Sequence, residues 1–247
     1  MKISIITIVY NNCQTIADAI DSVLSQTYAD IEYIIVDGLS TDGTVEIIKS
    51  YGNKISKFIS EKDKGLYDAI NKGIALASGD VIGLLHSDDI FYSTDAVKSV
   101  AETFQKHKAD CLYADLLYVD RLNPEKIIRN WKSGSYKRSS FVHGWMPPHP
   151  TFYVKRSVYK NLGLYDTSFK SAADYELMLR YLYKHKISTS YLPQYLVRMR
   201  VGGKSNITLR NRIQANNEDY QAWLVNGLEP RFYTRYLKPL RKLMQFF

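Results

Sequence analysis

The 247-residue sequence contains only two cysteines, Cys13 and Cys111, and no C-x-x-C pair. So few cysteines exclude a disulfide-stapled scaffold and favour a reducing compartment. No hydrophobic run reaches the roughly 18 residues of a membrane-spanning helix. The apolar segment at residues 3–9 is shorter than the core of a secretory signal and is followed by no small-residue cleavage site. We therefore expect a cytoplasmic protein.

Two common ligand-binding patterns are also missing. The glycine fingerprint G-x-G-x-x-G does not follow the first apolar segment, which argues against a dinucleotide-binding fold. A calcium loop that begins at Asp37 would need Glu at its twelfth position, where the sequence has Ile48. The sequence shows no internal repeat. A binding site must therefore come from other residues.

The composition is that of a globular protein, with 45% hydrophobic and 23% charged residues. The length suits one large domain, or one domain with an appendage. The net charge is +8, and most of the excess Lys and Arg lies in residues 121–247. A basic half indicates an anionic partner, which can be a nucleic acid, a membrane surface or a phosphorylated substrate.

Apolar, β-branched segments of strand length alternate with helical patterns in the first half. Strands buried on both faces are predicted at residues 3–9, 32–36, 55–60 and 81–85. Helices are predicted around residues 16–24, 45–48 and 66–77. This alternation predicts a doubly wound α/β sheet, in which ligands bind at the carboxyl ends of the strands.

The second half is less regular. Residues 131–150 are rich in Ser, Gly and Pro and predict a long loop. Helices are predicted at about 172–185 and 208–224, from their apolar stripes. From Pro230 onward, five Lys or Arg lie among aromatic and aliphatic residues, as in a basic amphipathic segment.

Residues 84–89, Leu-Leu-His-Ser-Asp-Asp, end the fourth predicted strand with two adjacent carboxylates. Because strand side chains alternate between faces, one of these acids faces a given ligand. A Mg²⁺ or Mn²⁺ ion on a diphosphate needs only one or two protein carboxylates, since phosphate oxygens and water complete its coordination. We therefore expect Ser87 and Asp88 at a metal–diphosphate site; a solvated turn with a capping Asp is the alternative.

Two further polar positions follow predicted strands. Asp37 ends the second strand, where a carboxylate can accept hydrogen bonds from a base or a ribose. Ordinary turn chemistry in Asp37-Gly38 is the alternative. Lys64 precedes the third predicted helix, where its charge opposes the helix dipole, so that it either serves a ligand or is simply solvated.

Two candidates lie in the second half. His149 stands among three prolines, which stiffen the backbone and can fix the imidazole over a site; a surface histidine is the commoner alternative. Asp174 is a candidate general base at the start of a helix, but Ser171 and Asp174 also match the capping box S-x-x-D. On these residues alone, the capping interpretation is favoured.

Residues 198–205 place two glycines between cations. Such a segment suits a flexible loop that closes on phosphate, with Arg200 and Lys204 as its ligands. A basic surface hairpin is the alternative.

In their order and spacing, these segments resemble the family 2 glycosyltransferases of the GT-A fold, over about residues 3–206. The matching pieces are SIITIVYNN, SVLSQTY, EYIIVDGLSTDGT, SEKDKGLYDAINKGI, ASGDVIGLLHSDD, HPTFYVKRSVYKNLGLYD, AADYELMLRYL and VGGKSN. The resemblance is strongest to bacterial enzymes of polysaccharide and lipid-linked glycan synthesis. It implies a Rossmann-like, mostly parallel sheet and a GT-A domain over residues 1–225. Residues 1–120 would form its nucleotide-sugar half and 121–225 its acceptor half, followed by a basic amphipathic tail at 226–247.

The resemblance also implies roles for single residues. Tyr10 and Asp37 match positions that hold the nucleotide base, usually uracil, and Lys64 lies in a segment that approaches the nucleotide. Asp88 matches the last acid of the D-x-D metal motif, whose first acid is replaced here by His86.

Asp174 matches the family's catalytic base, which raises it above the capping interpretation, although Ala173 stands where relatives often carry another acid. The implied reaction is metal-dependent, inverting transfer of a sugar from a nucleotide-diphosphate donor, with a UDP-sugar expected. The acceptor would be a hydroxyl of a glycan or lipid-linked saccharide.

Two rival functions remain. A nucleotidyltransferase would carry a glycine-rich, basic loop after its first strand, where this sequence has Tyr10-Asn11-Asn12. A basic nucleic-acid or membrane-binding module does not explain acids at several strand ends. We expect no nucleic-acid partner. For the tail, residues 230–247, we expect either contact with the inner face of the cell membrane or packing on the catalytic domain.

Overall fold

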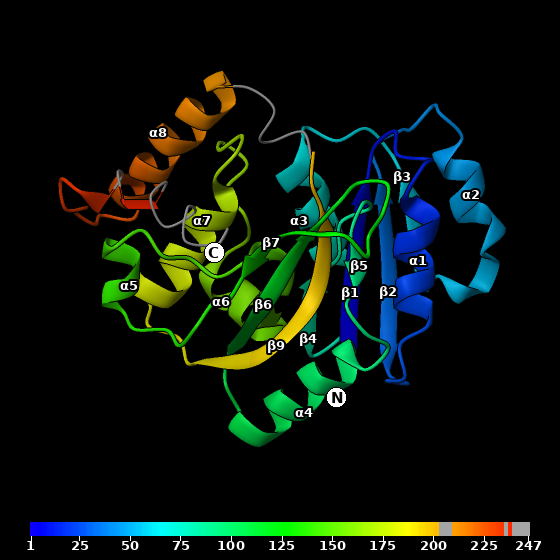
Figure 1. Cartoon of the computed structure of the whole chain (residues 1–247), viewed down its shortest axis with the longest axis horizontal. Coiled ribbons are helices and arrows are strands. Elements are labelled where there is room, and N and C mark those ends of the chain that lie inside the picture. Colours follow the sequence, from blue (N-terminus) through cyan, green and yellow to red (C-terminus); the bar gives the residue numbers. More distant parts are fainter. Residues whose placement is uncertain (203–208, 235–236, 239–247) are drawn as a thin grey trace.

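The structure, a computed structural model, describes residues 1–202, 209–234 and 237–238, and of residues 209–213 only the backbone. Most of its strands form one sheet that runs through both halves of the sequence (Figure 1). In the order in which they lie across the sheet, the strands are β3 (Lys57–Ser60), β2 (Ile31–Asp37), β1 (Ile3–Val9), β4 (Val81–Leu84), β8 (Tyr153–Lys155), β6 (Cys111–Val119), β9 (Thr189–Arg200) and β5 (Ile90–Phe91). Strand β7 (Ile127–Trp131) pairs with β6 outside this order.

The helices come from both halves of the chain. In chain order they are α1 (Ile16–Leu24), α2 (Thr44–Ser50), α3 (Leu66–Leu76), α4 (Ala96–His107), α5 (Ser139–Val142), α6 (Arg156–Leu162), α7 (Ala173–Met178) and α8 (Leu209–Val225). Short 3-10 turns lie at Gly52–Lys54 and His149–Thr151, and a π-helical turn at Leu179–Lys184 continues α7. Helices α1 and α2 lie at one end of the molecule, and α5, α7 and α8 at the other (Figure 1).

The first half follows the sequence pattern closely. Strands β1, β2, β3 and β4 are parallel to one another, and β1 lies between β2 and β4. Every residue of β1 is buried, which explains why the strand is mostly Ile and Val rather than alternating. Its two polar residues, Ser4 and Thr7, are hydrogen-bonded to Glu32 (2.6 Å) and Tyr33 (3.0 Å). The predicted strands and helices of this half are all present, within two residues at most ends.

The second half extends the sheet with mixed directions. Strand β8 runs antiparallel to both β4 and β6, whereas β9 runs parallel to β6. Strand β5 closes the edge, antiparallel to β9. The expected α/β, mostly parallel sheet is confirmed, and so are the helices predicted at 172–185 and 208–224. The predicted loop at 131–150 contains the short helix α5 and the start of a 3-10 turn.

Two apolar cores cover the two faces of the sheet. One contains residues of α3, α6, α7 and α8, together with alternate residues of β1 and β2. The other contains residues of α1 and α4 with the remaining residues of the same strands. This arrangement leaves the carboxyl ends of β1, β2, β4 and β6 at one edge. Within the described residues, no helix combines the length and apolarity needed to cross a membrane.

The part of the tail that the structure describes packs against the domain. Thr234 is buried and its Oγ1 donates a hydrogen bond to the Val142 carbonyl (2.9 Å). Lys238 Nζ pairs with Asp219 of α8 (2.6 Å) and lies 4.0 Å from the centre of the Tyr175 ring. Gly144 has a positive φ, and a Cβ on it would overlap the backbone of Lys238. Of the two expectations for the tail, packing on the domain therefore holds for these residues.

Candidate active site

The loops after β1, β2 and β4 are tied together at the carboxyl edge of the sheet. The backbone N–H of Asn12 donates to Thr44 Oγ1 (3.0 Å), and its side chain donates to Ser87 Oγ (2.9 Å). Thr15 Oγ1 donates to the Ser87 carbonyl (2.9 Å). Ser87 itself is buried. The expected nucleotide-binding segments are thus joined, and Ser87 serves as an anchor between them.

Tyr10 and Asp63 flank Gly38 at the end of β2. Tyr10 is 53% exposed, so part of this residue lies at the surface of the carboxyl edge. A Cβ built on Gly38 would lie 3.5 Å from the Tyr10 ring and would overlap the Asp63 carboxylate, so Asp63 in its present position packs closely on Gly38. The side chain of Lys64 is exposed directly after Asp63. The sequence interpretation named Tyr10 and Lys64 but missed Asp63, whose only signal was its place in the Asp-Lys-Gly segment.

Asp37 is fully buried and its carboxylate is bonded within the protein. It accepts hydrogen bonds from the Ser40 N–H (3.1 Å), from the Ser40 hydroxyl and from Ser60 Oγ (2.6 Å). These bonds fold the loop after β2 around the carboxylate. In this arrangement Asp37 shapes the expected base-binding loop from inside, where the sequence interpretation expected a contact with the base.

The acids after β4 lie in a tight turn. The Asp89 N–H donates to the His86 carbonyl (3.0 Å). The Asp89 side chain is buried, and burial, with the Asp88 charge adding to it, raises the pKa of its carboxyl well above the usual range. Asp88 is half-buried, and its carboxylate makes no hydrogen bond to the described part of the chain. The turn therefore presents Asp88 and keeps Asp89 inside.

Arg200, at the end of β9, fastens this turn. Only 4% of its surface is exposed. Its Nη1 donates to the Asp88 carbonyl (2.9 Å), its Nη2 pairs with Asp18 of α1 (2.6 Å), and its backbone N–H donates to Asp89 Oδ1 (3.2 Å). The expected phosphate ligand is thus already bonded inside the protein. Lys204, the second cation predicted for this loop, lies outside the described residues.

The second half brings a set of aromatic and titratable side chains to the same edge. Asp174, in the first turn of α7, accepts a hydrogen bond from the Tyr67 hydroxyl (3.3 Å). The Tyr67 ring stacks on Tyr165, with ring centres 5.8 Å apart. The Tyr165 hydroxyl bonds His149 Nε2 (2.8 Å), and the His149 ring lies 5.7 Å from His86. The chain of contacts thus runs from the base candidate to the metal-motif turn.

Burial keeps the two histidines of this set neutral. It lowers the pKa of His149 to about 4, with His86 adding to the effect and the Asp174 charge opposing it. Burial also lowers the pKa of His86, against the charges of Asp88 and Asp174. Both carboxylates therefore lie close enough to His86 to influence its charge. Tyr67 and Tyr165 were missed in the sequence interpretation, because tyrosine is common throughout this chain.

The capping interpretation of Asp174 is wrong. The residue before α7 is Ala172, and no side chain of the expected capping box caps the helix. Instead, Glu218 of α8 accepts hydrogen bonds from the backbone N–H groups of Ser171 (2.7 Å) and Ala172 (3.0 Å). The Asp174 carboxylate is thus not needed for helix capping.

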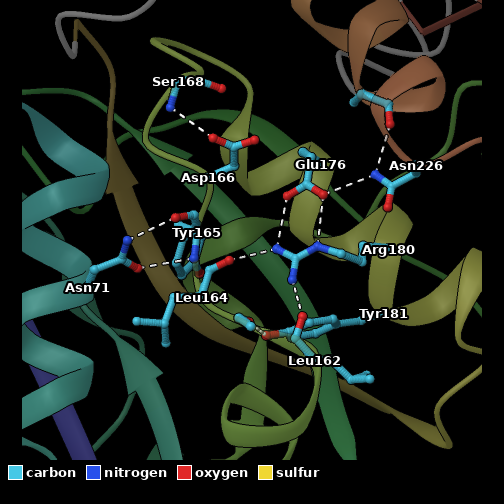
Figure 2. A network of polar contacts seen from close by, with 12 residues as sticks. Asn71, Leu162, Leu164, Tyr165, Asp166, Ser168, Glu176, Arg180, Tyr181 and Asn226 are labelled. Carbon is cyan, nitrogen blue, oxygen red and sulfur yellow. Dashed lines mark hydrogen bonds and ion pairs between the residues drawn. The ribbon is translucent and has the colours of Figure 1, made fainter.

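A network of hydrogen bonds holds the backbone around Tyr165 and the helix α7 in place (Figure 2). The Asn71 side chain donates to the Tyr165 carbonyl (2.8 Å) and accepts from its N–H (3.1 Å). Arg180 makes two bonds to Glu176 (2.8 and 3.0 Å) and donates to the carbonyls of Leu162 and Leu164. The loop that carries Tyr165 and the helix that carries Asp174 are therefore held as one unit.

The side chains that follow β4 could bind a hard divalent cation together with a diphosphate. Among the described residues, no three His, Cys, Asp or Glu side chains gather to enclose a metal ion. The half-buried Asp88 carboxylate, which accepts no hydrogen bond from the described residues, offers one anionic oxygen ligand, and this suffices when a diphosphate supplies the others. The residues present therefore fit a cation that arrives with the donor.

Comparison with known proteins decides the family. The sequence pattern of the family described as "Glycosyl transferase family 2" matches residues 4–171. The chain belongs to glycosyltransferase family 2. This family 2 enzyme is also 30% identical to an uncharacterized glycosyltransferase of Rickettsia typhi, over 89% of this chain and 69% of that protein. The rival interpretation as a non-enzymatic binding module is thereby set aside.

Solved structures share the fold of this glycosyltransferase. It superposes on TarS 1–349 of S. aureus, in complex with UDP-GlcNAc, with a TM-score of 0.69 and 19% identity. The match covers 92% of this chain and 65% of that TarS chain. The mannosyltransferase PcManGT of Pyrobaculum calidifontis, in complex with GDP-Man and Mn²⁺, gives a TM-score of 0.68 at 15% identity, over 98% of this chain and 68% of that one. The expected GT-A fold is confirmed.

Proposed function

We propose that this enzyme transfers a sugar from a nucleoside-diphosphate donor, with a UDP-sugar the expected one, to a hydroxyl of a glycan or lipid-linked saccharide. The observation that supports this proposal is the proximity of two segments from opposite halves of the chain. Asp174 and the turn at residues 86–89 are linked through contacts that include His86 and His149. Complexes of TarS with UDP-GlcNAc and of PcManGT with GDP-Man support a nucleotide-sugar donor.

The donor is proposed to lie along the carboxyl edge of the first half. Its base would lie against Tyr10, which is exposed at this edge, beside Gly38 and Asp63 and over the loop shaped by Asp37. Lys64, exposed next to Asp63, would face the phosphates or the base. The role of Arg200 would be indirect, since its guanidinium holds the turn that presents Asp88.

The diphosphate would lie at Asp88, with Mg²⁺ or Mn²⁺ held by this carboxylate and by phosphate oxygens. When bound, such an ion supplies positive charge for the leaving diphosphate. Asp88 is suited to hold it because its carboxylate carries no hydrogen bond from the described part of the chain.

Asp174 is proposed as the general base. One of its oxygens accepts from Tyr67, and the other is left to accept the proton of an acceptor hydroxyl. The deprotonated oxygen would attack the anomeric carbon as the bond to the diphosphate breaks, so that the configuration inverts. Neutral His149, fixed by Tyr165, would offer its free ring nitrogen to the donor sugar.

Peripheral membrane contact is a separate proposal. Phe232 is 86% exposed and follows the cation Arg231. An exposed aromatic side chain beside a cation suits the boundary between lipid headgroups and acyl chains. Such contact would bring the enzyme to a lipid-linked acceptor.

Donor hydrolysis tests the core of this proposal without knowledge of the acceptor. UDP-, GDP- and dTDP-sugars would be incubated with the protein and Mn²⁺, with thermal stabilisation as a second readout. We expect one nucleotide class to stabilise the protein and to be hydrolysed slowly, with loss of both effects in the Asp88→Asn variant. Stabilisation by none of the three classes would contradict the proposal.

A further inference from the structure

The first turn of α7 depends on α8 for its capping contacts. The N–H groups of Ser171 and Ala172 point to Glu218 Oε2, at 2.7 and 3.0 Å, across 47 and 46 residues of sequence. The other carboxylate oxygen, Oε1, accepts a hydrogen bond from Gln214 Nε2 (2.9 Å). Both oxygens of Glu218 are therefore held, and its orientation relative to α7 is fixed.

Two more contacts, one from α8 and one from Asn226 directly after it, reach α7 on the other side of Asp174. The buried Trp223 donates to the Tyr175 hydroxyl (2.9 Å), and Asn226 donates to Glu176 Oε1 (3.0 Å). These contacts thus bracket Asp174, with Glu218 before it and Trp223 and Asn226 after it. The Asp174 carboxylate itself accepts a hydrogen bond from Tyr67 of α3 (3.3 Å).

The contacts before Asp174 and those after it hold different parts of the chain. Trp223 and Asn226 contact side chains, whereas Glu218 holds the backbone itself, two and three residues before Asp174. Movement of the backbone at residues 171–172 would rotate the first turn of α7. Because Asp174 lies in that turn, its carboxylate would move relative to Tyr67 and His149.

We propose that Glu218 is a positioning residue for Asp174, which it holds through the backbone of the α7 first turn. The proposal rests on the proposed role of Asp174 as general base. Glu218 sets the position of this turn through the length of its side chain and through the oxygen acceptor at its end. Its negative charge is not required for this role.

Two substitutions separate length from charge. Glu218→Gln keeps the length and one oxygen acceptor, and its amide can donate to Gln214 if that side chain turns its own oxygen inward. Glu218→Asp keeps the charge but shortens the reach by one methylene. Hydrolysis of the donor sugar gives kcat and KM, UDP titration gives donor-side affinity, and a thermal melt reports folding. Glu102→Ala, an exposed acid on α4, is the matched control.

We expect Glu218→Gln to stay within about 3-fold of the unsubstituted enzyme in kcat. Glu218→Asp should lose about 10- to 100-fold in kcat, since misplacement by about 1 Å can cost that much. The KM for the donor and the affinity for UDP should be unchanged in both. The control should match the unsubstituted enzyme in all readouts.

Other outcomes overturn the inference. Equal kcat in the Asp and Gln variants, with only the melting temperature changed, would show a purely structural role. A larger loss in Glu218→Gln than in Glu218→Asp would show that charge matters and geometry does not. An unsubstituted enzyme that binds UDP but hydrolyses no donor, with all Glu218 variants alike, would instead count against the proposed function.

Discussion

Residues 1–120 and 121–247 of this glycosyltransferase differ in charge, regularity and task. The first segment carries 18 Asp and Glu against 10 Lys and Arg, and the second carries 7 against 23. The first builds parallel strands with helices between them, and the second adds an antiparallel strand, a long β9 and extended loops. The regular half presents the donor-side candidates, and the irregular half presents Asp174 against them. The difference indicates that donor and acceptor functions can be damaged separately.

The largest expected effect falls on the donor side. Asp88→Asn should abolish turnover and weaken metal-dependent UDP binding, because it removes the one carboxylate offered to a metal–diphosphate. Calorimetric titration with UDP, with and without Mn²⁺, measures this. A far-UV spectrum and melting temperature like those of the unsubstituted protein control for folding. Full activity in excess chelator would refute the metal requirement.

The next effect should fall on the acceptor side alone. Asp174→Asn should leave UDP affinity nearly unchanged but lower the transfer or hydrolysis rate by about 10²–10⁴-fold, the usual range for loss of a general base. Single-turnover rates at saturating donor test this. Because Asp174 does not cap α7, the melting temperature should barely change. If Asp174→Asn and Asp88→Asn weaken UDP binding alike, the division between the halves fails.

A smaller effect concerns the free energy of unfolding at acid pH, which depends on the pKa of His149. Burial holds the pKa of His149 near 4, below the roughly 6.5 of an unfolded chain. As pH falls below about 6.5, the unfolded chain takes up a proton that the folded protein refuses, so the free energy of unfolding decreases until pH 4. The contribution is at most roughly 3 kcal/mol.

His149→Gln should remove this part of the pH dependence. Urea unfolding of both proteins between pH 7 and pH 4 would measure it. The groups that face the imidazole are His86, Asp174 and Tyr165, and they remain in the variant. If the free energy of unfolding depends on pH in the same way for both proteins, the pKa of His149 is not lowered in the folded state.

The smallest expected effect concerns the tail. Phe232→Ser should weaken binding to vesicles that contain anionic lipid, roughly 5-fold, by removing apolar surface from the interface. Leu122→Ser is the control, since Leu122 is 92% exposed at a different place, between β6 and β7. Hydrolysis of the donor in solution should be unaffected in both variants. Equal vesicle binding by both would leave no role for Phe232 at a membrane.

The sequence predicted the two halves unequally, for a physical reason. Residues 3–9 were predicted as a strand with the bounds of β1, because a strand buried on both faces is mostly apolar and does not alternate. Strand β9 was missed, since it mixes buried and exposed residues and includes Pro193. Strand β6 was missed as well. Its sequence, CLYADLLYV, interrupts an apolar run with the buried Asp115.

The sequence predicted which residues belong to the candidate site but not how they contact one another. The family resemblance pointed to Asp88 and Asp174, but that both carboxylates lie near enough to His86 to influence its pKa depends on the folded sheet. Arg200 was predicted as a phosphate ligand from its basic, glycine-rich surroundings. Its partner Asp18 lies 182 residues away, so no local pattern could reveal that pair.

The late arrival of β9 has a consequence for how this chain folds as it is made. Strand β5 pairs with β9, and the Asp88 turn is fastened by Arg200, 111 residues after Asp89. At about 5–20 residues per second, a ribosome needs several seconds to synthesise that stretch. For most of this time the nascent chain carries strands β1 to β6 without β9, so that one edge of the sheet is unpaired. We therefore expect chaperones to bind arrested chains that end before residue 200 more strongly than chains that extend beyond it, because an unpaired edge can pair with other chains.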